Sequence, residues 1–271
     1  MKLAILLSTY NSEVFIKAQL DSLMSQTYKD WTLFIRDDQS KDATPQLLQH
    51  YSDNDSRIQI LPDRNKRGAR DGFMWLLQEV NADLYMFCDH DDVWLPEKIE
   101  RTVQLIEEQH NDNVPMIACT NLKLVDKELH VLAEDYWTHR HYRNSDFNDK
   151  YFHLYYNNMP GCTMLINRKA REVALPYPKN TIMHDAWIAA AVLWKGGKVV
   201  WTDEPLMLYR QHGNNTIGAS DRTFMQQLGM LNELLAKTRT QYYSCLSLIN
   251  MSYTRFFITK VYYLLRSYMS R

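Results

Sequence analysis

The segment Asp89-His90-Asp91-Asp92, directly after the apolar residues 84–88, is the part of the sequence best equipped for chemistry. Carboxylates this close together repel one another, so a cation or hydrogen-bond donors must offset their charge. Oxygen-rich sites without thiolates suit Mg²⁺ or Mn²⁺, and such ions are usually shared with a substrate diphosphate. The alternative is a solvated acidic turn that caps the next helix, and we favour the ligand role over it.

A second acidic turn, at residues 37–42, follows the apolar residues 31–36. Ser40 and Asp42 are explained by capping of the next helix, but Asp38 is not, because a helix start needs no second carboxylate at the strand end. A carboxylate there could accept a hydrogen bond from the imide N–H of uracil or thymine. Asp38 is therefore a candidate for binding a pyrimidine.

Four basic side chains lie between the two acidic turns: Arg64, Lys66, Arg67 and Arg70. They could neutralise a diphosphate or form an ordinary solvated loop, and the sequence favours neither. The nearby Gly68 and Gly72 lack the spacing of a dinucleotide-binding fingerprint, and the sequence contains no G-x-x-x-x-G-K-[ST] motif. These two observations exclude nicotinamide-dependent enzymes and P-loop kinases.

Two further candidates stand in the second half of the chain. His184 and Asp185 begin the apolar stretch 186–194, where the positive end of a helix dipole would keep Asp185 ionised, as a catalytic base requires. An aspartate in the first turn of a helix is also common without any catalytic role. His212 lies among amides in a glycine-containing loop, where it is either solvated or a nitrogen ligand beside a carboxylate-bound ion.

These side chains must be positioned by regular elements, and the first half alternates β-rich runs with helical stretches. We expect strands at residues 3–8, 31–36, 57–61 and 84–88. We expect helices at residues 13–25, 44–51, 72–80 and 96–108, the first with Val14, Leu20, Leu23 and Met24 on its inner side. This alternation predicts an α/β fold with a mostly parallel sheet flanked by helices. The polar residues after the strand ends should therefore converge at one edge.

The second half is less regular. We expect strands at residues 116–120, 162–166, 198–201 and 207–209, and a helix at residues 184–194. Residues 123–160 are polar and aromatic with weak periodicity. No internal repeat or low-complexity segment interrupts the chain.

Length and composition exclude several classes of protein. The 271 residues correspond to one large domain or two small ones, and the balance of 31 basic against 32 acidic residues argues against a nucleic-acid binder. No stretch approaches the ~20 apolar residues of a membrane-spanning helix. The apolar run at the start is short for a signal peptide, so we expect a first strand there. The four widely spaced cysteines predict free thiols in a reducing compartment, and thus a cytoplasmic protein.

The tail, residues 222–271, differs in charge from the rest, with seven basic residues and one acidic residue. From Arg255 onward a predicted helix carries apolar side chains on one side: Phe257, Val261, Leu264, Leu265 and Tyr268. Its other side carries basic residues: Arg255, Lys260, Arg266 and Arg271. Such a helix could contact an anionic membrane surface through residues 253–271, dock on the catalytic part of the chain or form a homodimer, and the sequence leaves the three open.

Taken in order, the motifs resemble those of family-2 glycosyltransferases of the GT-A fold, in particular the bacterial rhamnosyltransferase-like branch of surface polysaccharide synthesis. The resemblance covers residues 1–218 and rests on residues 8–11, 25–27, 36–40, 89–98, 161–163, 184–185 and 209–215. It implies a Rossmann-like catalytic domain at residues 1–220. In this domain, residues 1–122 would bind the nucleotide sugar, and residues 123–220 would hold the acceptor and the catalytic residue. Residues 221–271 would form a helical extension.

The resemblance also implies a role for each candidate. The donor-binding residues would be Thr9, Tyr10, Asp38, Arg67, Arg70, Asp89 and His212. Asp91 would bind Mn²⁺ or Mg²⁺, with His212 as a second ligand from a loop that closes over the diphosphate. Asp185 would be the catalytic base, and Gly161, His184 and Trp187 would lie on the acceptor side.

The implied reaction is an inverting transfer in which Asp185 takes the proton of the acceptor hydroxyl. The donor would be dTDP-rhamnose, and the acceptor a growing, lipid-linked surface glycan such as a capsule, O-antigen or lipopolysaccharide chain. A UDP-hexose donor, UDP-galactose or UDP-glucose, is the first alternative, and a non-catalytic sugar-nucleotide-binding subunit is the second. The protein is then expected in the cytoplasm, peripheral on the cytoplasmic face of the inner membrane.

Overall fold

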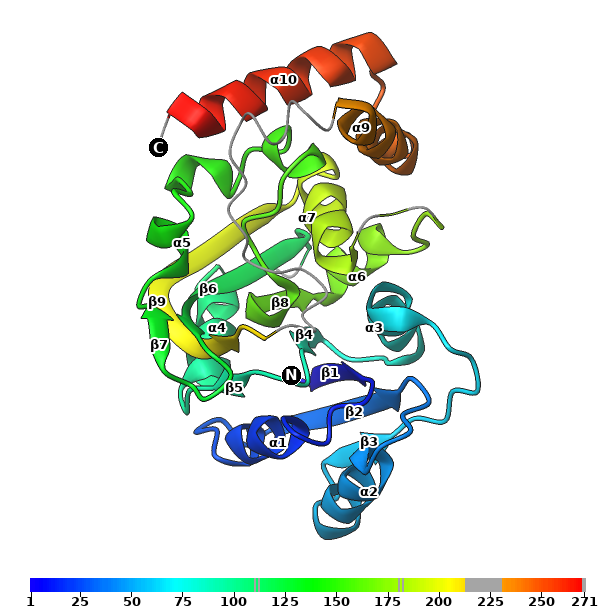
Figure 1. Ribbon diagram of the computed structural model, residues 1–271, viewed down its shortest axis with the longest axis vertical. Helices are drawn as coiled ribbons and strands as arrows, with labels where there is room; N and C mark the ends of the chain where they lie inside the picture. The colour runs from blue at the N-terminus through cyan, green and yellow to red at the C-terminus, as the bar shows by residue number, and fades with distance from the viewer. Residues whose placement is uncertain (110, 112, 180, 182, 213–230, 270–271) are drawn as a thin grey trace.

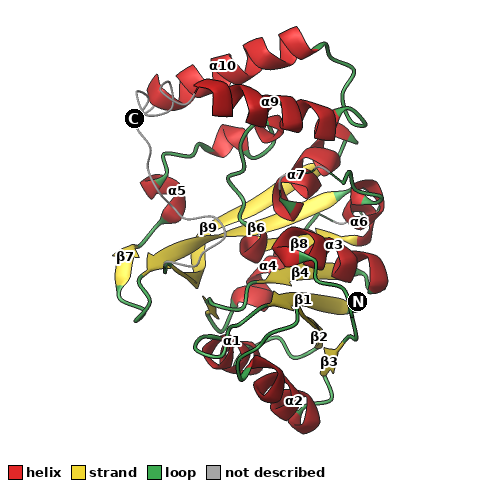
Figure 2. Ribbon diagram, turned by 45° about the vertical axis from the view of Figure 1, so that its right-hand side comes forward, coloured by secondary structure: helices red, strands yellow, loops and turns green. Residues whose placement is uncertain are grey.

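The computed structural model describes every residue except 110, 112, 180, 182, 213–230, 270 and 271 (Figure 1). The described residues build one nine-stranded sheet in the order β3-β2-β1-β4-β8-β6-β9-β5, with β7 paired to β6 beside this path. Helices cover both faces of the sheet (Figures 1 and 2). This arrangement confirms the predicted α/β fold.

The first half alternates strands and helices as the sequence predicts. Its elements are β1 (Leu3–Thr9), α1 (Ile16–Met24), β2 (Trp31–Asp37), α2 (Thr44–Asn54), β3 (Ile58–Ile60), α3 (Gly68–Glu79) and β4 (Leu84–Cys88). β1 pairs in parallel with both β2 and β4. In this register Thr9 lies beside Asp37 and Leu7 beside Cys88, so the polar residues that follow these strands meet at one edge of the sheet.

β1 shows how one strand supplies two cores, because successive side chains of a strand point to opposite faces. Its alternate residues Leu3, Ile5 and Leu7 pack in the core beneath α1 and α4. Ala4 and Leu6 pack in the core on the other face, beneath α3 and α7. Every residue of β1 is buried, which explains the continuous apolar run of its first five residues, Leu3 to Leu7.

The first helix is shorter than we predicted. α1 begins at Ile16 rather than at residue 13, because the carbonyl of Ser12 accepts from the backbone N–H groups of Phe15 and Ile16 and closes a turn there. Val14 lies in this turn and is 76% exposed, so its predicted place on the inner side was wrong. Ile16, Leu20 and Leu23 form the buried side instead.

The second half mixes strand directions. Its elements are β5 (Val93–Trp94), α4 (Lys98–Glu107), β6 (Met116–Val125), β7 (Val131–Ala133), α5 (Tyr136–His139), the 3₁₀ turns η1 (Asn144–Asp146), η2 (Phe152–Leu154) and η3 (Gly161–Thr163), β8 (Met164–Asn167), α6 (Arg168–Ala174), α7 (His184–Trp194) and β9 (Lys198–Arg210). β8 runs antiparallel to β4 and β6, whereas β9 runs parallel to β6. The predicted strand at residues 162–166 begins later because a 3₁₀ turn comes first.

The two short strands that we predicted at residues 198–201 and 207–209 are one strand, β9. The register of β9 against β6 shifts where Thr120 pairs with Thr202 and Asn121 with Pro205. This irregularity accommodates Pro205, which has no N–H to donate to a regular ladder. β9 thereby continues to Arg210 and carries the next residues to the edge where β1 and β4 end.

The described part of the tail forms two helices, α9 (Leu231–Cys245) and α10 (Tyr253–Met269), at the end of the molecule opposite α2 (Figures 1 and 2). α10 docks through Phe256 and Tyr263, whose rings contact Tyr155 at centroid distances of 4.7 and 5.9 Å. The Tyr263 hydroxyl also donates to Asp149 at 2.6 Å. The predicted boundary between residues 220 and 221 falls outside the described residues.

The docked side of α10 does not coincide with the apolar side that the sequence predicted. Lys260, expected among the basic residues, is buried with its ammonium 2.5 Å from the Gln241 side chain, and burial lowers the pKa of Lys260 to about 8. Val261 and Leu265, expected on the apolar side of the helix, are exposed. Aromatic contacts to residues 152–155 select the docked face, and a periodicity count cannot reveal them. The side chain of Tyr268 and residue Arg271 lie outside the described part.

Among the described residues, no helix combines the length and apolar character needed to cross a membrane. The cysteines Cys88, Cys119, Cys162 and Cys245 are all buried and free, which confirms the prediction of unpaired thiols.

Candidate functional site

The acidic turn after β4 opens into a cavity of about 420 Å³. The cavity lies at the carboxyl ends of β1 and β4 and extends toward α7 and α9. Its lining includes Ser8, Asp89, Asp91, Gly161, His184, Asp185, Trp187 and Tyr209. The structure therefore brings together candidates that the sequence places almost a hundred residues apart.

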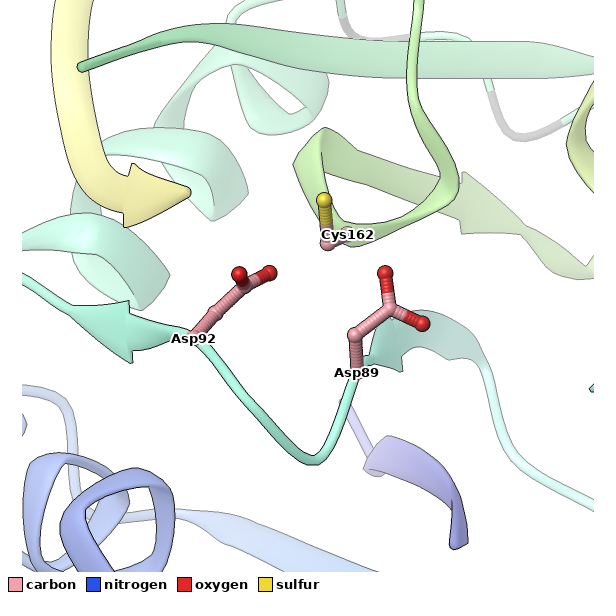
Figure 3. A group of neighbouring side chains, drawn as sticks. All are labelled: Asp89, Asp92 and Cys162. Atoms are coloured by element: carbon pink, nitrogen blue, oxygen red, sulfur yellow. The ribbon is translucent and has the colours of Figure 1, made fainter. Parts of the chain in front are cut away.

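The carboxylates of the turn face a thiol across a short gap. Figure 3 shows Asp89 at the end of β4, Asp92 just before β5, and Cys162 of η3 near both. One side-chain ligand atom of each lies within 4.8 Å of the other two. Burial and the charges of Asp92 and Asp89 raise the pKa of the Cys162 thiol, so it remains protonated and is a hydrogen-bond donor to the carboxylates.

Burial and neighbouring negative charges also raise the pKa values of Asp89 and Asp92 in this turn. Burial, followed by the charges of Asp91 and Asp185, raises the pKa of Asp89 to about 7. Burial and the charges of Asp91 and Asp89 also raise the pKa of Asp92, whose Oδ2 atom has no hydrogen-bond partner among the described residues. Because these carboxylates repel one another, a positive charge bound among them would stabilise their ionised forms.

His212 lies beside the acidic turn, close enough to Asp91 for the two side chains to bind one metal ion together. Its Nε2 atom is 2.8 Å from Oδ2 of Asp91, and its ring stacks on Phe15 at a centroid distance of 4.7 Å. Arg210 fixes this approach, because its Nε donates to the Asp91 carbonyl at 2.7 Å and its backbone N–H donates to Asp92 at 3.1 Å. The carboxylate oxygens and the imidazole nitrogen are donors that suit Mn²⁺ or Mg²⁺, so the residues present fit the predicted ion.

Asp185 lies in the first turn of α7, where the sequence predicted it. Its Oδ1 accepts from the backbone N–H of Ala186 at 2.7 Å, and its Oδ2 accepts from Gly161 at 3.1 Å. These two donors fix the position of the carboxylate at the N-terminal end of α7. Asp185 is 8% exposed and faces the same cavity as Asp91.

The predicted acceptor-side residues surround Asp185. His184 is buried against the rings of Phe73 and Phe87, and burial lowers its pKa. Neither ring nitrogen of His184 has a partner among the described residues, although the side chain lines the cavity. A Cβ on Gly161 would lie 2.5 Å from His184 Nε2, so only glycine fits there. Trp187 lines the cavity as well and donates from Nε1 to the Ala174 carbonyl at 2.8 Å.

Asp38 occupies a separate, buried position one strand away. It accepts from the guanidinium of Arg36 and from the backbone N–H groups of Arg67 at 2.7 Å and Gly68 at 3.0 Å. Burial opposes ionisation of Asp38, but these donors hold its pKa below the ordinary value. Asp38 is not among the described residues that line the cavity around Asp91 and Asp185. It anchors the basic loop, and its contact with a pyrimidine stays a prediction.

The remaining donor-side candidates are spread along the same edge. Thr9 is buried with its hydroxyl 2.5 Å from that of Ser12, and Tyr10 is 40% exposed beneath the ammonium of Lys66. Arg67 pairs with Asp63 at 2.5 Å. Arg70 pairs with Asp71 and lines a different cavity. The structure thus separates Arg70 from the acidic turn.

Two charged residues of this region received no role from the sequence. Arg36 is fully buried and binds Asp38 and Asp63. Lys98 is fully buried beneath the acidic turn, with its ammonium 3.4 Å from the Thr120 hydroxyl, and burial lowers its pKa to about 8. The available signal was that Arg36 directly follows the buried Ile35 in β2 and that Lys98 directly precedes the buried Ile99 in α4.

Comparison with known proteins identifies this arrangement. The model of the family "Glycosyl transferase family 2" matches residues 4–174. The dTDP-rhamnosyl transferase RfbG of Shigella flexneri is 29% identical over 234 residues, which cover 79% of this chain and 74% of RfbG. The UDP-Glc:alpha-D-GlcNAc-diphosphoundecaprenol beta-1,3-glucosyltransferase WfgD of Escherichia coli is 32% identical over 103 residues, covering 38% of this chain and 40% of WfgD.

Solved structures share the fold. TarS 1-349 of S. aureus, in complex with UDP-GlcNAc, matches 99% of this chain and 73% of its own with a TM-score of 0.67 and 16% identity. The mannosyltransferase PcManGT of Pyrobaculum calidifontis, in complex with GDP-Man and Mn²⁺, matches 99% of this chain and 71% of its own with a TM-score of 0.67 and 12% identity.

Proposed function

The chain belongs to glycosyl transferase family 2 and is a glycosyltransferase of the GT-A fold; from this premise we propose that it transfers L-rhamnose from dTDP-rhamnose to a bacterial surface glycan with inversion. The observation that carries the proposal is that Asp91, in the turn after β4, and Asp185, in the first turn of α7, line one cavity. A nucleotide sugar held at Asp91 would present its anomeric carbon to a hydroxyl activated at Asp185. The rhamnosyl donor is supported by the similarity to RfbG.

Asp185 is the proposed base. Its carboxylate takes the proton from the acceptor hydroxyl as that oxygen attacks the anomeric carbon, which typically accelerates such a step about 10²–10⁴-fold. The backbone N–H groups of Gly161 and Ala186 hold the carboxylate in place before the attack. A single base and direct displacement of the nucleoside diphosphate give inversion at the anomeric carbon.

Asp91 and His212 are the proposed ligands of a divalent cation. When bound, Mn²⁺ or Mg²⁺ supplies a Lewis acid for the departing diphosphate. Asp89, at the end of β4, would accept from the ribose hydroxyls of the donor, while Thr9, Tyr10 and Asp38 would bind the base. The Arg36 contacts that orient Asp38 also support this arrangement.

The proposed acceptor is a saccharide linked to a lipid by a diphosphate, in line with the acceptor named for WfgD. The cavity beside Asp185 is lined by aromatic side chains suited to stacking on sugar rings: Tyr136, Tyr142, Tyr155, Tyr156 and Trp187. Several of these come from the polar, aromatic stretch 123–160, which lies within the half of the domain that the family resemblance assigns to the acceptor.

Such an acceptor is held at a membrane, and α10 offers a surface for contact with it. Ile258, Val261, Tyr262 and Leu265 are exposed at helical spacing on the side that does not dock. We therefore propose a peripheral location on the cytoplasmic face of the inner membrane, with a homodimer as the alternative use of this face.

The membrane contact is tested by flotation with vesicles containing phosphatidylglycerol. We expect Ile258→Ser combined with Leu265→Ser to reduce vesicle binding, whereas Leu132→Ser on β7, 60% exposed, serves as the matched control. Unchanged flotation of the double variant together with a loss of dimer in gel filtration would support the homodimer instead.

The function is tested by supplying the full chain with dTDP-rhamnose, UDP-galactose and UDP-glucose and measuring nucleoside diphosphate release with Mn²⁺, with Mg²⁺ and with a chelator. We expect metal-dependent release from dTDP-rhamnose. Release from a UDP-hexose alone would identify that alternative donor. Binding of a nucleotide sugar without release from any donor, with or without an acceptor, would favour a non-catalytic subunit.

A further inference from the structure

A second cavity, of about 1270 Å³, lies between the loop that precedes α7 and the hairpin of α9 and α10. Four parts of the chain line it: Arg70 near the start of α3, Lys179 and Thr181 in the loop, Arg239 with several neighbours on α9, and Tyr253 at the start of α10. The chemistry proposed above uses none of these side chains.

The charge of this cavity is positive. Arg70, Lys179 and Arg239 contribute to its lining, and no carboxylate is among the described residues that line it. Arg70 is paired with Asp71, whereas Lys179 and Arg239 form no ion pair within the described part of the chain. Arg239 lies over the ring of Tyr243, 5.7 Å from its centre, which orients the guanidinium without neutralising it.

The second cavity lies on the acceptor side of the proposed active site and away from the donor side. Thr181 lines both this cavity and the one that contains Asp185, so the two adjoin. Nη1 of Arg70 donates to the Thr181 carbonyl at 2.6 Å and thereby ties α3 to the shared wall. The donor diphosphate belongs beside Asp91 and His212, at the acidic turn, whose residues do not line the second cavity.

We propose that this second cavity binds the diphosphate that joins the acceptor saccharide to its lipid; the inference rests on the proposed function and extends it to the acceptor. Arginine and lysine are the side chains that bind phosphate oxygens most strongly, through charge-assisted hydrogen bonds. Tyr253, the first residue of α10, lines the cavity too, so a lipid leaving the diphosphate starts beside the helix with the exposed apolar side chains.

The test measures binding of decyl diphosphate to the full chain by calorimetry. Lys179→Gln and Arg239→Gln each remove one charge at an exposed position, and we expect each to weaken binding about tenfold, the loss typical of one charged hydrogen bond. Lys237→Gln is the matched control, because Lys237 is exposed on the same helix and does not line the cavity. We expect dTDP, which occupies the donor site, not to displace the probe.

Three results would overturn the proposal: displacement of decyl diphosphate by dTDP, equal weakening by Lys237→Gln and Arg239→Gln, or unchanged binding in both cavity variants. If the cavity variants instead lose only vesicle binding, the charges act on the lipid surface and the proposal is wrong. Nucleoside diphosphate release from the nucleotide sugars, with and without an acceptor, is measured on the same samples and separates the two hypotheses. Its absence in the wild type under both conditions contradicts the proposed function, whereas the decyl diphosphate result does not depend on it.

Discussion

Nε2 of His212 lies 2.8 Å from Oδ2 of Asp91, although the two residues are 121 positions apart in the sequence. The contact depends on β9, which runs on to Arg210 and is joined there to the acidic turn through Asp91 and Asp92. A loop histidine is thereby held beside a strand-end carboxylate, as a shared cation requires.

Replacing His212 by alanine should therefore weaken the metal dependence of the enzyme rather than its fold. We expect the Mn²⁺ concentration for half-maximal activity to rise at least about tenfold, the scale seen when groups that support a metal site are lost. His50→Ala on α2 removes an exposed histidine elsewhere and should leave the metal titration unchanged. An unaltered titration curve for His212→Ala would remove His212 from the ligand set.

Asp185→Asn tests the catalytic base. The substitution preserves the size of the side chain in the first turn of α7, so we expect the protein to remain folded and to bind nucleotide normally. Transfer to the acceptor should fall by about 10²–10⁴-fold, because the amide cannot take the hydroxyl proton. Thermal denaturation and dTDP binding provide the controls, and near-normal turnover by Asp185→Asn would show that another group is the base.

Gly161→Ala should damage the acceptor side of the cavity through a single contact. The added Cβ would lie 2.5 Å from Nε2 of His184, so the imidazole must move toward Phe73 or the turn must shift away from Asp185. We expect destabilisation of about 1–3 kcal/mol, as for other overpacked sites. The loss of transfer should exceed any loss of donor binding.

Combining Gly161→Ala with His184→Ala identifies the source of that damage. Truncating the imidazole removes the atom that the new methyl group meets, so the double variant should be more stable than the sum of the single changes predicts. Strictly additive free energies of unfolding, measured by urea denaturation, would show that the strain lies in the backbone of the turn.

The parts of the site that the sequence predicted are those whose signals are local. β4 and α7 have their predicted bounds because an apolar run of five residues before Asp89 and the apolar stretch after Asp185 are continuous in the sequence. The direction of β1, β2 and β4 followed from the helices between them, and parallel pairing then placed their polar ends together.

The remaining features depend on partners that a linear pattern does not reveal. Arg36 is fully buried because Asp38 and Asp63 meet it from two separate loops. The docked face of α10 is selected by Tyr155 and its neighbours rather than by the hydrophobicity of the helix itself. The burial of Arg36 is stabilised by ion pairs whose members look solvated in the sequence. The docking of α10 is stabilised by contacts between residues more than twenty positions apart.

His153 provides a prediction about pH and stability. It is 3% exposed in η2, with Nε2 3.2 Å from the Phe147 carbonyl, and burial lowers its pKa to about 4. An unfolded chain restores the ordinary histidine pKa of about 6.5. Between these values the unfolded state binds a proton that the folded state does not, so the contribution of His153 to stability is present above pH 6.5 and is lost as the pH falls to about 4.

The loss amounts to about 3 kcal/mol over this range, since each unit of pKa difference corresponds to about 1.4 kcal/mol. His153→Gln has no such proton to take up, so its free energy of unfolding should fall less steeply with acid than that of the wild type. Urea denaturation at pH 7, 5.5 and 4.5 measures both slopes, with His50→Gln as an exposed control. Parallel curves for wild type and His153→Gln would mean that the imidazole remains accessible to protons in the folded protein, and the buried cluster that α10 covers would then have to open under native conditions.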